Sequence, residues 1–237
     1  MRLITWNCCR GAYHKKVPLL DSLRPDIAVI QECAKPLVSS EQCLWFGDNP
    51  RQGVAVHAYG DYRLRTLPPV ADVPRYVIPV EVSGPINFLL MAVWAKGDRP
   101  WPYVEGVIRA VELYRDIFRQ LPAVFAGDFN SNAIWDSSHR NGRNHTGLVK
   151  LLSELGLESG YHAFYQEEHG KETQATFDFR KSPAKPFHID YCFVPKGWLP
   201  ALRGVEIGTY QDWTKHSDHR PLLVDVFDPM QTAEMGG

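Results

Sequence analysis

Two stretches of the sequence share one pattern, in which a helix end is followed by a proline, an apolar strand and a carboxylate. Residues 23–32 read LRPDIAVIQE and residues 121–128 read LPAVFAGD, so the two strands end at Glu32 and Asp128. A strand with apolar residues on both faces lies deep in a sheet, and an acid at its C-terminal tip lies at the sheet edge where ligands bind. The first strand ends in the same way, at Asn7. The pattern therefore predicts an α/β fold in which three strands bring polar side chains to one rim.

Apolar spacing and turn residues predict the other elements. We expect helices at 15–23, 103–121 and 147–155, ending near Pro25, Pro122 and Gly156. Short, apolar-rich segments bounded by turn residues predict strands at 2–6, 26–31, 53–59, 75–82, 86–94, 123–127, 187–194 and 222–226. Because so few helices cannot cover a fully parallel sheet, we expect mixed sheets with many antiparallel pairs.

The composition excludes several classes of protein. The chain has 237 residues, of which 44% are hydrophobic and 22% charged, which suits one catalytic domain at 1–229 followed by a flexible tail at 230–237. A formal net charge of −1 argues against binding of nucleic acid through bulk positive charge. Five cysteines without a CxxC pair argue against a disulfide framework and a structural zinc site, and favour a cytoplasmic location. We expect no signal peptide and no membrane span, since no apolar run reaches about 20 residues.

Five short segments carry polar residues that suit catalysis. Taken singly, each has an ordinary structural explanation, such as a turn after a strand, a surface acid or a solvated sheet face. The segments are ITWN at 4–7, DIAVIQE at 26–32, GDFN at 127–130, HIDY at 188–191 and SDHRPL at 217–222.

Together and in this order, the five segments resemble the signature blocks of the endonuclease/exonuclease/phosphatase family, and they extend from residue 3 to about residue 226. The resemblance implies a four-layer α/β/β/α sandwich, with two mixed β-sheets packed face to face and helices outside. It also implies a divalent-metal-dependent phosphodiesterase. The expected activity is that of a nuclease that cleaves DNA or RNA by in-line attack of an activated water.

The acidic residues of these segments indicate a cation independently of the resemblance. Glu32, Asp128, Asp190 and Asp218 on one rim would repel one another and raise at least one pKa, unless a cation neutralised them. Magnesium suits such a site, because it accepts one or two protein carboxylates and completes its shell with water and substrate phosphate. Mn²⁺ is the expected substitute. On the family pattern, Glu32 and Asp218 hold the metal with Asn7 close by.

The resemblance also suggests the catalytic roles. Asp128 orients or deprotonates the attacking water, and Asn130 donates its amide to a phosphate oxygen or to Asp128. His219 contacts the scissile phosphate, while Asp190 fixes its tautomer or its charge. Whether the general base is Asp128 or the His219–Asp190 pair stays open.

Two positions depart from the family pattern. Cys9 stands where many apurinic-type nucleases have Asp or Asn, and Trp94 stands where the family has a His or Tyr phosphate contact. An indole donates one hydrogen bond but transfers no proton, so Tyr103 and His145 are candidate replacements for acid help to the leaving group. The alternative outside the enzymes is a metal-binding pseudoenzyme or adapter that has lost this chemistry.

The expected substrate contacts are Trp94, Tyr103, Arg140, Arg143 and His145. The last three belong to a basic segment that suits phosphate contacts, although a solvated loop explains it equally well. The near-neutral charge favours short or single-stranded nucleic acid, or a small phosphodiester, over tight duplex binding. A phosphomonoesterase, or a hydrolase of small-molecule or lipid phosphoesters on the same site, is the enzymatic alternative. No obligate protein partner and no membrane association are expected.

Overall fold

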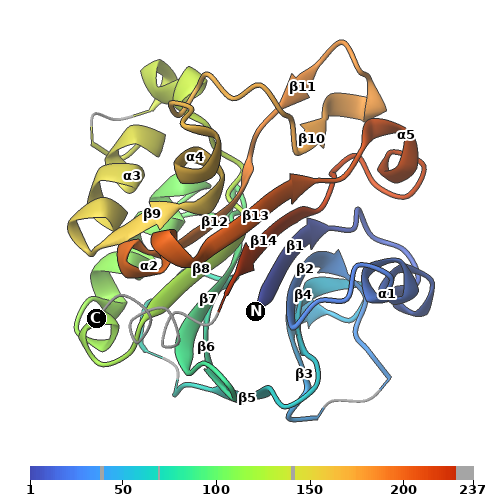
Figure 1. Cartoon of the computed structure of the whole chain (residues 1–237). Helices are drawn as coiled ribbons and strands as arrows, with labels where there is room; N and C mark the ends of the chain where they lie inside the picture. The colour runs from blue at the N-terminus through green and yellow to red at the C-terminus, as the bar shows by residue number, and fades with distance from the viewer. Residues whose placement is uncertain (38–39, 69, 140–141, 228–237) are drawn as a thin grey trace.

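The computed structural model describes residues 1–37, 40–68, 70–139 and 142–227 (Figure 1). The expected tail at 230–237 and the candidate substrate contact Arg140 lie outside these residues. Within the described part of the chain, no helix is both long enough and apolar enough to cross a membrane.

Two six-stranded sheets form the centre of the fold. In spatial order, the first sheet contains β13 (Leu202–Ile207), β14 (Leu222–Val226), β1 (Arg2–Asn7), β2 (Ile27–Cys33), β4 (Gln52–Ala58) and β3 (Cys43–Asn49). The second contains β5 (Arg63–Thr66), β6 (Val77–Ser83), β7 (Phe88–Trp94), β8 (Ala123–Asp128), β12 (Asp190–Pro195) and β9 (Leu157–Ser159). Both sheets are mixed, as expected, since β1–β2 and β7–β8 pair in parallel and their neighbours pair antiparallel.

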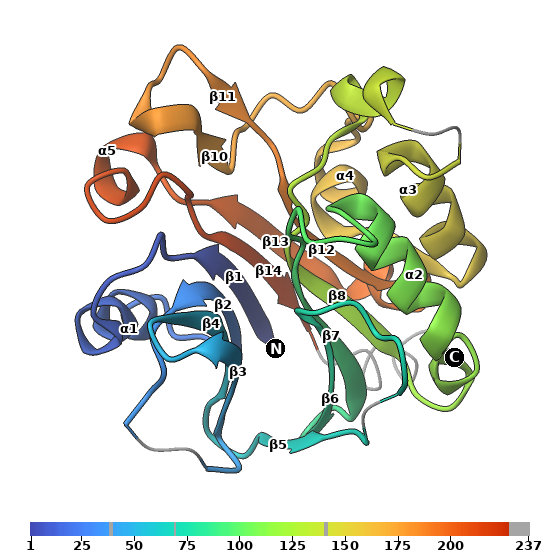
Figure 2. The ribbon, with the colours of Figure 1, turned by 180° about the vertical axis from the view of Figure 1, so that it is seen from behind.

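The helices cover the outer faces of the two sheets, which completes the four-layer sandwich (Figures 1 and 2). Helix α1 (Tyr13–Asp21) places Leu20 in the apolar cluster outside the first sheet. Helices α2 (Val104–Tyr114) and α3 (His145–Glu154) pack in the apolar cluster outside the second. The shorter elements are α4 (Gly160–Tyr165), α5 (Tyr210–Trp213), the hairpin of β10 (Phe177–Asp178) and β11 (Pro186–Phe187), and 3₁₀ turns at Ile117–Arg119, Ala133–Ser138, Phe179–Lys181 and Lys196–Ala201.

The repeated sequence pattern corresponds to two βαβ units. In β1–α1–β2 and again in β7–α2–β8, a helix crosses over to a parallel strand that follows a proline and carries an acid at or near its C-terminal end, Glu32 or Asp128. Parallel strands point their C-terminal ends to the same edge. The repeat therefore brings both acids to the C-terminal edges of their sheets.

Alternation along the strands decides which side chains face the other sheet. On β8, Val124 and Ala126 lie in the apolar layer between the sheets, so Asp128 continues that face. On β1, Leu3 lies in the same layer, so Asn7 continues its face. The side chains that face the other sheet are thus apolar along most of each strand and polar at one end, where the sheets meet solvent.

All eight expected strands are present, with ends that differ by up to three residues. The 187–194 strand is interrupted, since Phe187 pairs with β10 and β12 begins only at Asp190. The 103–121 helix ends at Tyr114 and resumes as a 3₁₀ turn at Ile117–Arg119. The sequence pattern missed the four sheet-edge strands β3, β5, β9 and β13, and also β10, because these strands are short or carry charged and glycine residues in place of a long apolar run.

Gly127 provides a test of the close packing of β7 against β8. Its φ is +155°, and a Cβ there would lie 1.9 Å from the backbone oxygen of Val93, its register partner on β7. We expect Gly127→Ala to lower the free energy of unfolding by about 3 kcal/mol or more, measured by urea denaturation. The control is Gly197→Ala, because a Cβ at Gly197 meets no atom within 4 Å. Equal effects of the two substitutions would contradict this account.

Candidate active site

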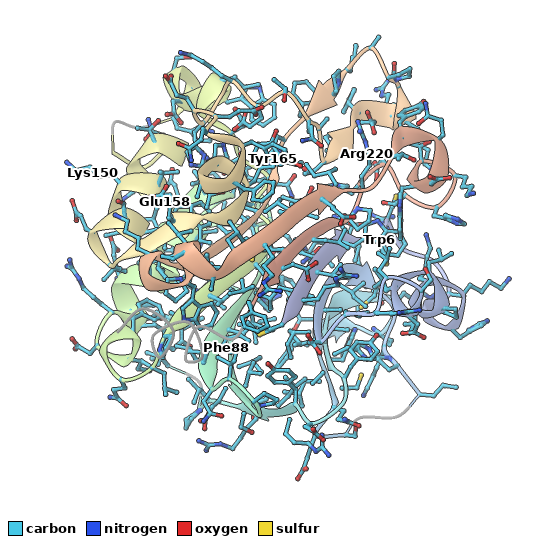
Figure 3. All side chains as sticks on the ribbon, viewed as in Figure 1. Trp6, Phe88, Lys150, Glu158, Tyr165 and Arg220 are labelled. Carbon is cyan, nitrogen blue, oxygen red and sulfur yellow. The ribbon has the colours of Figure 1, made fainter. Side chains whose placement is uncertain are left out.

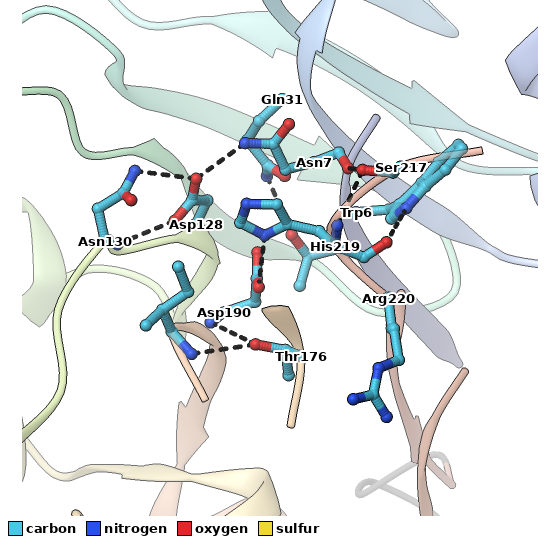
Figure 4. A network of polar contacts seen from close by, with 12 residues as sticks. Trp6, Asn7, Gln31, Asp128, Asn130, Thr176, Asp190, Ser217, His219 and Arg220 are labelled. Atoms are coloured by element: carbon cyan, nitrogen blue, oxygen red, sulfur yellow. Dashed lines mark hydrogen bonds and ion pairs between the residues drawn. The ribbon is translucent and has the colours of Figure 1, made fainter. Parts of the chain in front are cut away.

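Four of the predicted catalytic and metal-site residues meet at the polar end of the inter-sheet layer (Figure 4). Asn7 at the end of β1 donates from Nδ2 to Asp128 Oδ2 at 2.9 Å, which connects the two sheets directly. Asp190 begins β12 as the antiparallel register partner of Asp128. His219, just before β14, places Nδ1 2.9 Å from Asp190 Oδ2. Residues from the two ends of the sequence and from its middle thus form one continuous polar network.

Asp128 is fully buried and its carboxylate is held by amide groups. Besides Asn7, Asn130 donates from Nδ2 to Oδ2 at 3.0 Å and from its backbone N–H to Oδ1 at 2.9 Å. Burial raises the pKa of Asp128 to about 7, against the lowering effect of the His219 charge. A group with such a pKa exchanges protons near neutral pH, which suits a general base.

His219 is a cation in this network at neutral pH. Burial acts to lower the pKa of His219, but the charges of Asp190 and Asp128 outweigh burial and raise it to about 9. A doubly protonated imidazole donates hydrogen bonds and stabilises negative charge, but accepts no proton. Between the two candidate bases, this arrangement therefore favours Asp128.

Three buried residues outside the candidate set hold this network. Thr176 Oγ1 accepts hydrogen bonds from the backbone N–H groups of Ile189 and Asp190, both at 3.0 Å. Ser217 Oγ donates to the backbone oxygen of Asn7 at 2.7 Å and accepts from the N–H of His219 at 3.0 Å. Trp6 Nε1 donates to the His219 carbonyl at 3.0 Å. Trp6 and Ser217 both belong to the sequence segments at 4–7 and 217–222. Thr176 carried no sequence signal, because its role arises only from its contact with β12.

Glu32 reaches the same rim through a bulge. The register of β2 against β4 shifts between Gln31 and Cys33, and Glu32 has a φ of +57°. Its carboxylate accepts hydrogen bonds from Asn7 Nδ2 at 3.3 Å and from Gln52 Nε2 at 3.0 Å. The side chain is 22% exposed, so it also faces solvent.

Asp218 and Glu32 both act on the exposed Cys9. The pKa of Cys9 is raised, first by partial burial and then by the negative charge of Asp218 and a hydrogen bond to it, with a smaller effect of Glu32. The thiol is therefore close to two of the three predicted metal ligands. The third, Asn7, donates its amide nitrogen to Glu32 and Asp128, while its Oδ1 accepts from the Cys9 N–H at 3.0 Å.

The donor atoms of this rim fit a hard divalent cation. One carboxylate oxygen each from Asp128 and Asp190 and one ring nitrogen of His219 lie within 4.8 Å of one another, and the two carboxylates are the oxygen donors of this group. Asp190 Oδ1 is buried and has no hydrogen-bond partner among the described residues. A carboxylate oxygen of this kind is stabilised by a nearby positive charge. The sequence-predicted ligand set of Glu32, Asp218 and Asn7 supplies further oxygen atoms on the solvent side.

The predicted substrate contacts lie in different places. Trp94 neighbours Asp128 in the β7–β8 register but is buried against Tyr76, at a ring distance of 4.9 Å. Tyr103 is 44% exposed at the start of α2. Arg143 pairs with Glu112 of α2 at 3.0 Å.

His145 lies on the buried side of the loop that follows Asp128. It is 1% exposed, and both of its ring nitrogens have partners, Ser131 Oγ at 2.9 Å and His169 Nδ1 at 3.0 Å. Burial lowers the pKa of His145 to about 4. The sequence showed a basic segment here, but not that α3 begins at this residue and turns the ring inward.

A cleft with basic side chains adjoins the site. It has a volume of about 530 Å³, and its lining includes Arg75, Lys96, Arg99 and Trp101. The residue before Lys96, Ala95, exchanges hydrogen bonds with the catalytic loop: its N–H donates to the Asp128 carbonyl at 2.8 Å and its oxygen accepts from Asn130 Nδ2 at 2.9 Å. Lys96, which lines the cleft, is therefore one residue along the chain from a backbone group that is bonded to the catalytic loop.

Comparison with known proteins shows the family and the fold. The family model described as the Endonuclease/Exonuclease/phosphatase family matches residues 4–219. The 3′-5′ exonuclease of Neisseria meningitidis is 22% identical and superposes with a TM-score of 0.66 over 95% of this chain and 99% of that chain. An AP endonuclease from Archaeoglobus fulgidus is 19% identical, with a TM-score of 0.68 over 95% and 99%. A 3′ phosphatase from Neisseria bound to a product DNA hairpin is 21% identical, with a TM-score of 0.67 over 96% and 99%. No curated protein matches the sequence significantly.

The raised pKa of His219 has a consequence for stability. His219 ordinarily titrates at 6.5 and in the fold at about 9, so its contribution is complete below pH 6.5 and is lost as the pH rises toward 9. We expect the free energy of unfolding of the chelator-treated protein to fall across this window, measured by urea denaturation at successive pH values. His219→Gln should flatten this part of the profile, whereas His14→Gln on the exposed side of α1 should not. A wild-type stability that rises from pH 7 to 9 would contradict the assignment.

Proposed function

Since the chain belongs to the Endonuclease/Exonuclease/phosphatase family, we propose that it is a divalent-metal-dependent phosphodiesterase, and most specifically a nuclease acting on DNA or RNA. The observation that carries the proposal is a pair of buried groups, one suited to accept a proton and the other positively charged. Asp128 titrates near neutral pH, and His219 is held positive by Asp190. Hydrolysis of a phosphodiester needs both, a proton acceptor for water and positive charge for the phosphate.

In this proposal, Asp128 accepts the proton of the water that attacks phosphorus in line with the leaving oxygen. Asn7 and Asn130 keep the carboxylate oriented through three hydrogen bonds of 2.9–3.0 Å. His219 donates to a non-bridging phosphate oxygen and stabilises the charge that develops there, while Asp190 fixes the imidazole from behind.

The proposed cofactor is Mg²⁺, with Mn²⁺ as substitute. Glu32 and Asp218 would hold it, with Asn7 beside them, because they offer carboxylate oxygens at the solvent side of the rim. When bound, the ion supplies positive charge for the phosphate and for the leaving oxygen.

The basic cleft supports nucleic acid as the substrate. Lys96, Arg75 and Arg99 carry positive charge for a phosphate backbone, and Trp101 offers a ring for stacking. Arg75 is paired with Asp48 and Lys96 with Asp98, so a phosphate would compete with these two acids. Lys96 Nζ also lies 4.8 Å from the ring centre of Trp94, so the tryptophan at the family's phosphate-contact position supports a lysine. The proposed location is cytoplasmic, which rests on the five cysteines without a CxxC pair in the sequence.

A phosphomonoesterase on the same site is the second candidate. A structure of similar fold is a 3′ phosphatase bound to a product DNA hairpin, so this fold accommodates monoester chemistry in that protein. The pseudoenzyme alternative is disfavoured, because hydrogen bonds through Asn7 and Ser217 join the Asp128–Asn130 pair to the His219–Asp190 pair in one network.

The central test is Asp128→Asn in a panel of substrates with Mg²⁺. The amide accepts no proton at neutral pH, so we expect turnover of the preferred substrate to fall about 10³-fold, with an unchanged circular dichroism spectrum. The panel compares abasic duplex DNA, single-stranded DNA, RNA, a nitrophenyl phosphodiester and phosphomonoesters.

The matched control is Asp61→Asn, since Asp61 is an exposed acid between β4 and β5. Near-normal activity of Asp128→Asn would refute Asp128 as the base. Wild-type activity on monoesters alone would favour the phosphatase. Wild-type inactivity on every substrate would favour the pseudoenzyme.

Lys96 tests whether the cleft carries a nucleic-acid backbone. For a nucleic-acid substrate, we expect Lys96→Gln to raise KM several-fold and to reduce the slope of log(kcat/KM) against log salt concentration by about 0.7–0.9, since one phosphate contact is lost. Lys150→Gln is the control, because Lys150 extends into solvent from α3 (Figure 3). Salt-independent turnover of the wild type would instead favour a small phosphoester.

A further inference from the structure

A second polar cluster, which the proposed function does not use, lies behind the catalytic loop. Its members are four histidines and one glutamate: His145, His162, His169, His188 and Glu172. Three of the imidazoles are nearly inaccessible, at 1–5% exposure for His145, His162 and His188, and the Glu172 side chain is 5% exposed. Buried histidines in such number rarely serve packing alone.

Three of these residues present ligand atoms to one another. His162 Nε2 lies 3.1 Å from Glu172 Oε1, and the rings of His162 and His169 stack at 3.5 Å. One ligand atom from each of the three lies within 4.8 Å of the others. A zinc ion at about 2.1 Å from each ligand holds tetrahedral ligand atoms about 3.4 Å apart, so small ring rotations bring these atoms into range.

The outer nitrogens of both imidazoles are already held by second partners. His162 Nδ1 lies 2.7 Å from Ser159 Oγ. His169 Nδ1 lies 3.0 Å from His145 Nε2, and His145 Nδ1 lies 2.9 Å from Ser131 Oγ. Metal-binding histidines are oriented in this way, since the partner of one ring nitrogen fixes the tautomer that leaves the other as ligand.

The remaining nitrogen of His169 is buried and unused. Nε2 has no hydrogen-bond partner among the described residues, although solvent hardly reaches it. Burial, assisted by the charges of His162 and His145, lowers the pKa of His169 to about 2. Burial acts to raise the pKa of Glu172, but hydrogen bonds from His162, Gly170 and Asn132 lower it to about 2. The ligand atoms on offer are thus the unpartnered Nε2 of His169 and the carboxylate of Glu172, two of the donor types that bind transition metals.

We propose that His162, His169 and Glu172 form a binding site for a transition-metal dication, with Zn²⁺ as the best fit, separate from the Asp128 site. Two imidazoles and one carboxylate favour zinc over magnesium, which prefers oxygen ligands. A neighbouring cavity of about 230 Å³, lined by Glu172, His188 and Asn132, leaves room for a solvent or small ligand to complete the shell. The sequence-based expectation against structural zinc concerned cysteine ligands, and this site uses none.

The metal would stabilise the loop that carries Asn130. Asn132 Nδ2 donates to Glu172 Oε2 at 3.1 Å and to the His188 carbonyl at 2.8 Å, and Ser131 contacts His145. Residues 131 and 132 follow Asn130 directly. A bound ion would therefore fix the 162–172 segment against the catalytic loop as a positioning element.

The test is metal titration of the chelator-treated full chain with excess Mg²⁺ present. We expect one equivalent of Zn²⁺ by calorimetry, a raised melting temperature, and a visible Co²⁺ spectrum of four- or five-coordinate nitrogen and oxygen ligation. His169→Gln and Glu172→Gln should weaken Zn²⁺ binding about 100-fold or more. His145→Gln should weaken it about 10- to 100-fold, because His145 orients the ring of His169 without touching the metal.

Two controls assign the ion to this cluster. His14→Gln should bind Zn²⁺ as the wild type does. Asp128→Asn should also retain the zinc, since it alters only the catalytic site around Asp128. Wild-type protein that takes up no Zn²⁺, or uptake that is unchanged in His169→Gln, would overturn the proposal. If the ligand variants do not fold, the wild-type Co²⁺ spectrum decides, because oxygen-only octahedral ligation would also overturn it.

Discussion

The carboxylate of Asp128 is buried at the end of the apolar layer between two sheets, and much of the surrounding structure compensates for that burial. An isolated buried carboxylate costs several kcal/mol, so it persists only with hydrogen bonds and opposite charge. Asn7 supplies one bond from the other sheet, Asn130 supplies two from the following loop, and His219 supplies the charge. The packing of the sheets and the geometry of the site therefore depend on each other, because a shift of one sheet against the other would break the Asn7–Asp128 hydrogen bond.

The sequence predicted the positions of those site residues that lie at the ends of apolar strands. Asn7 and Asp128 end apolar strands, so their edge was predictable, and the order of the motifs indicated the family and its fold. Thr176 was not predictable, because it matters only through its contact with the start of β12. The position of His145 also depends on tertiary structure, since a basic segment is compatible with an exposed loop or with the buried start of a helix. A sequence pattern indicates which chemistry a residue can perform, whereas long-range packing determines where its side chain lies.

The histidines show how strongly placement decides chemistry. His219 faces two carboxylates, so its pKa rises to about 9, whereas His169 is buried among other imidazoles and its pKa falls to about 2. One residue type thus becomes a cation on one side of the catalytic loop and a neutral imidazole on the other. The same contrast separates the two proposed metal sites, because carboxylate oxygens attract Mg²⁺ and imidazoles attract Zn²⁺. The loop between them, residues 128–132, contributes side chains to both.

Backbone strain at the rim argues that its conformation is kept for function. Cys9, Glu32 and Asn130 all have positive φ, between 46° and 57°, although none is glycine. Each such residue costs about 1 kcal/mol or more. The bulge at Glu32 has a visible effect: β2 places Ala28 and Ile30 toward the outer cluster, so unbroken alternation would aim residue 32 away from Asn7. With the bulge, Cys33 takes the outer position and Glu32 meets Asn7 at the rim. A fold selected for stability alone would relax this turn, whereas a site that needs a carboxylate beside Asn7 requires it.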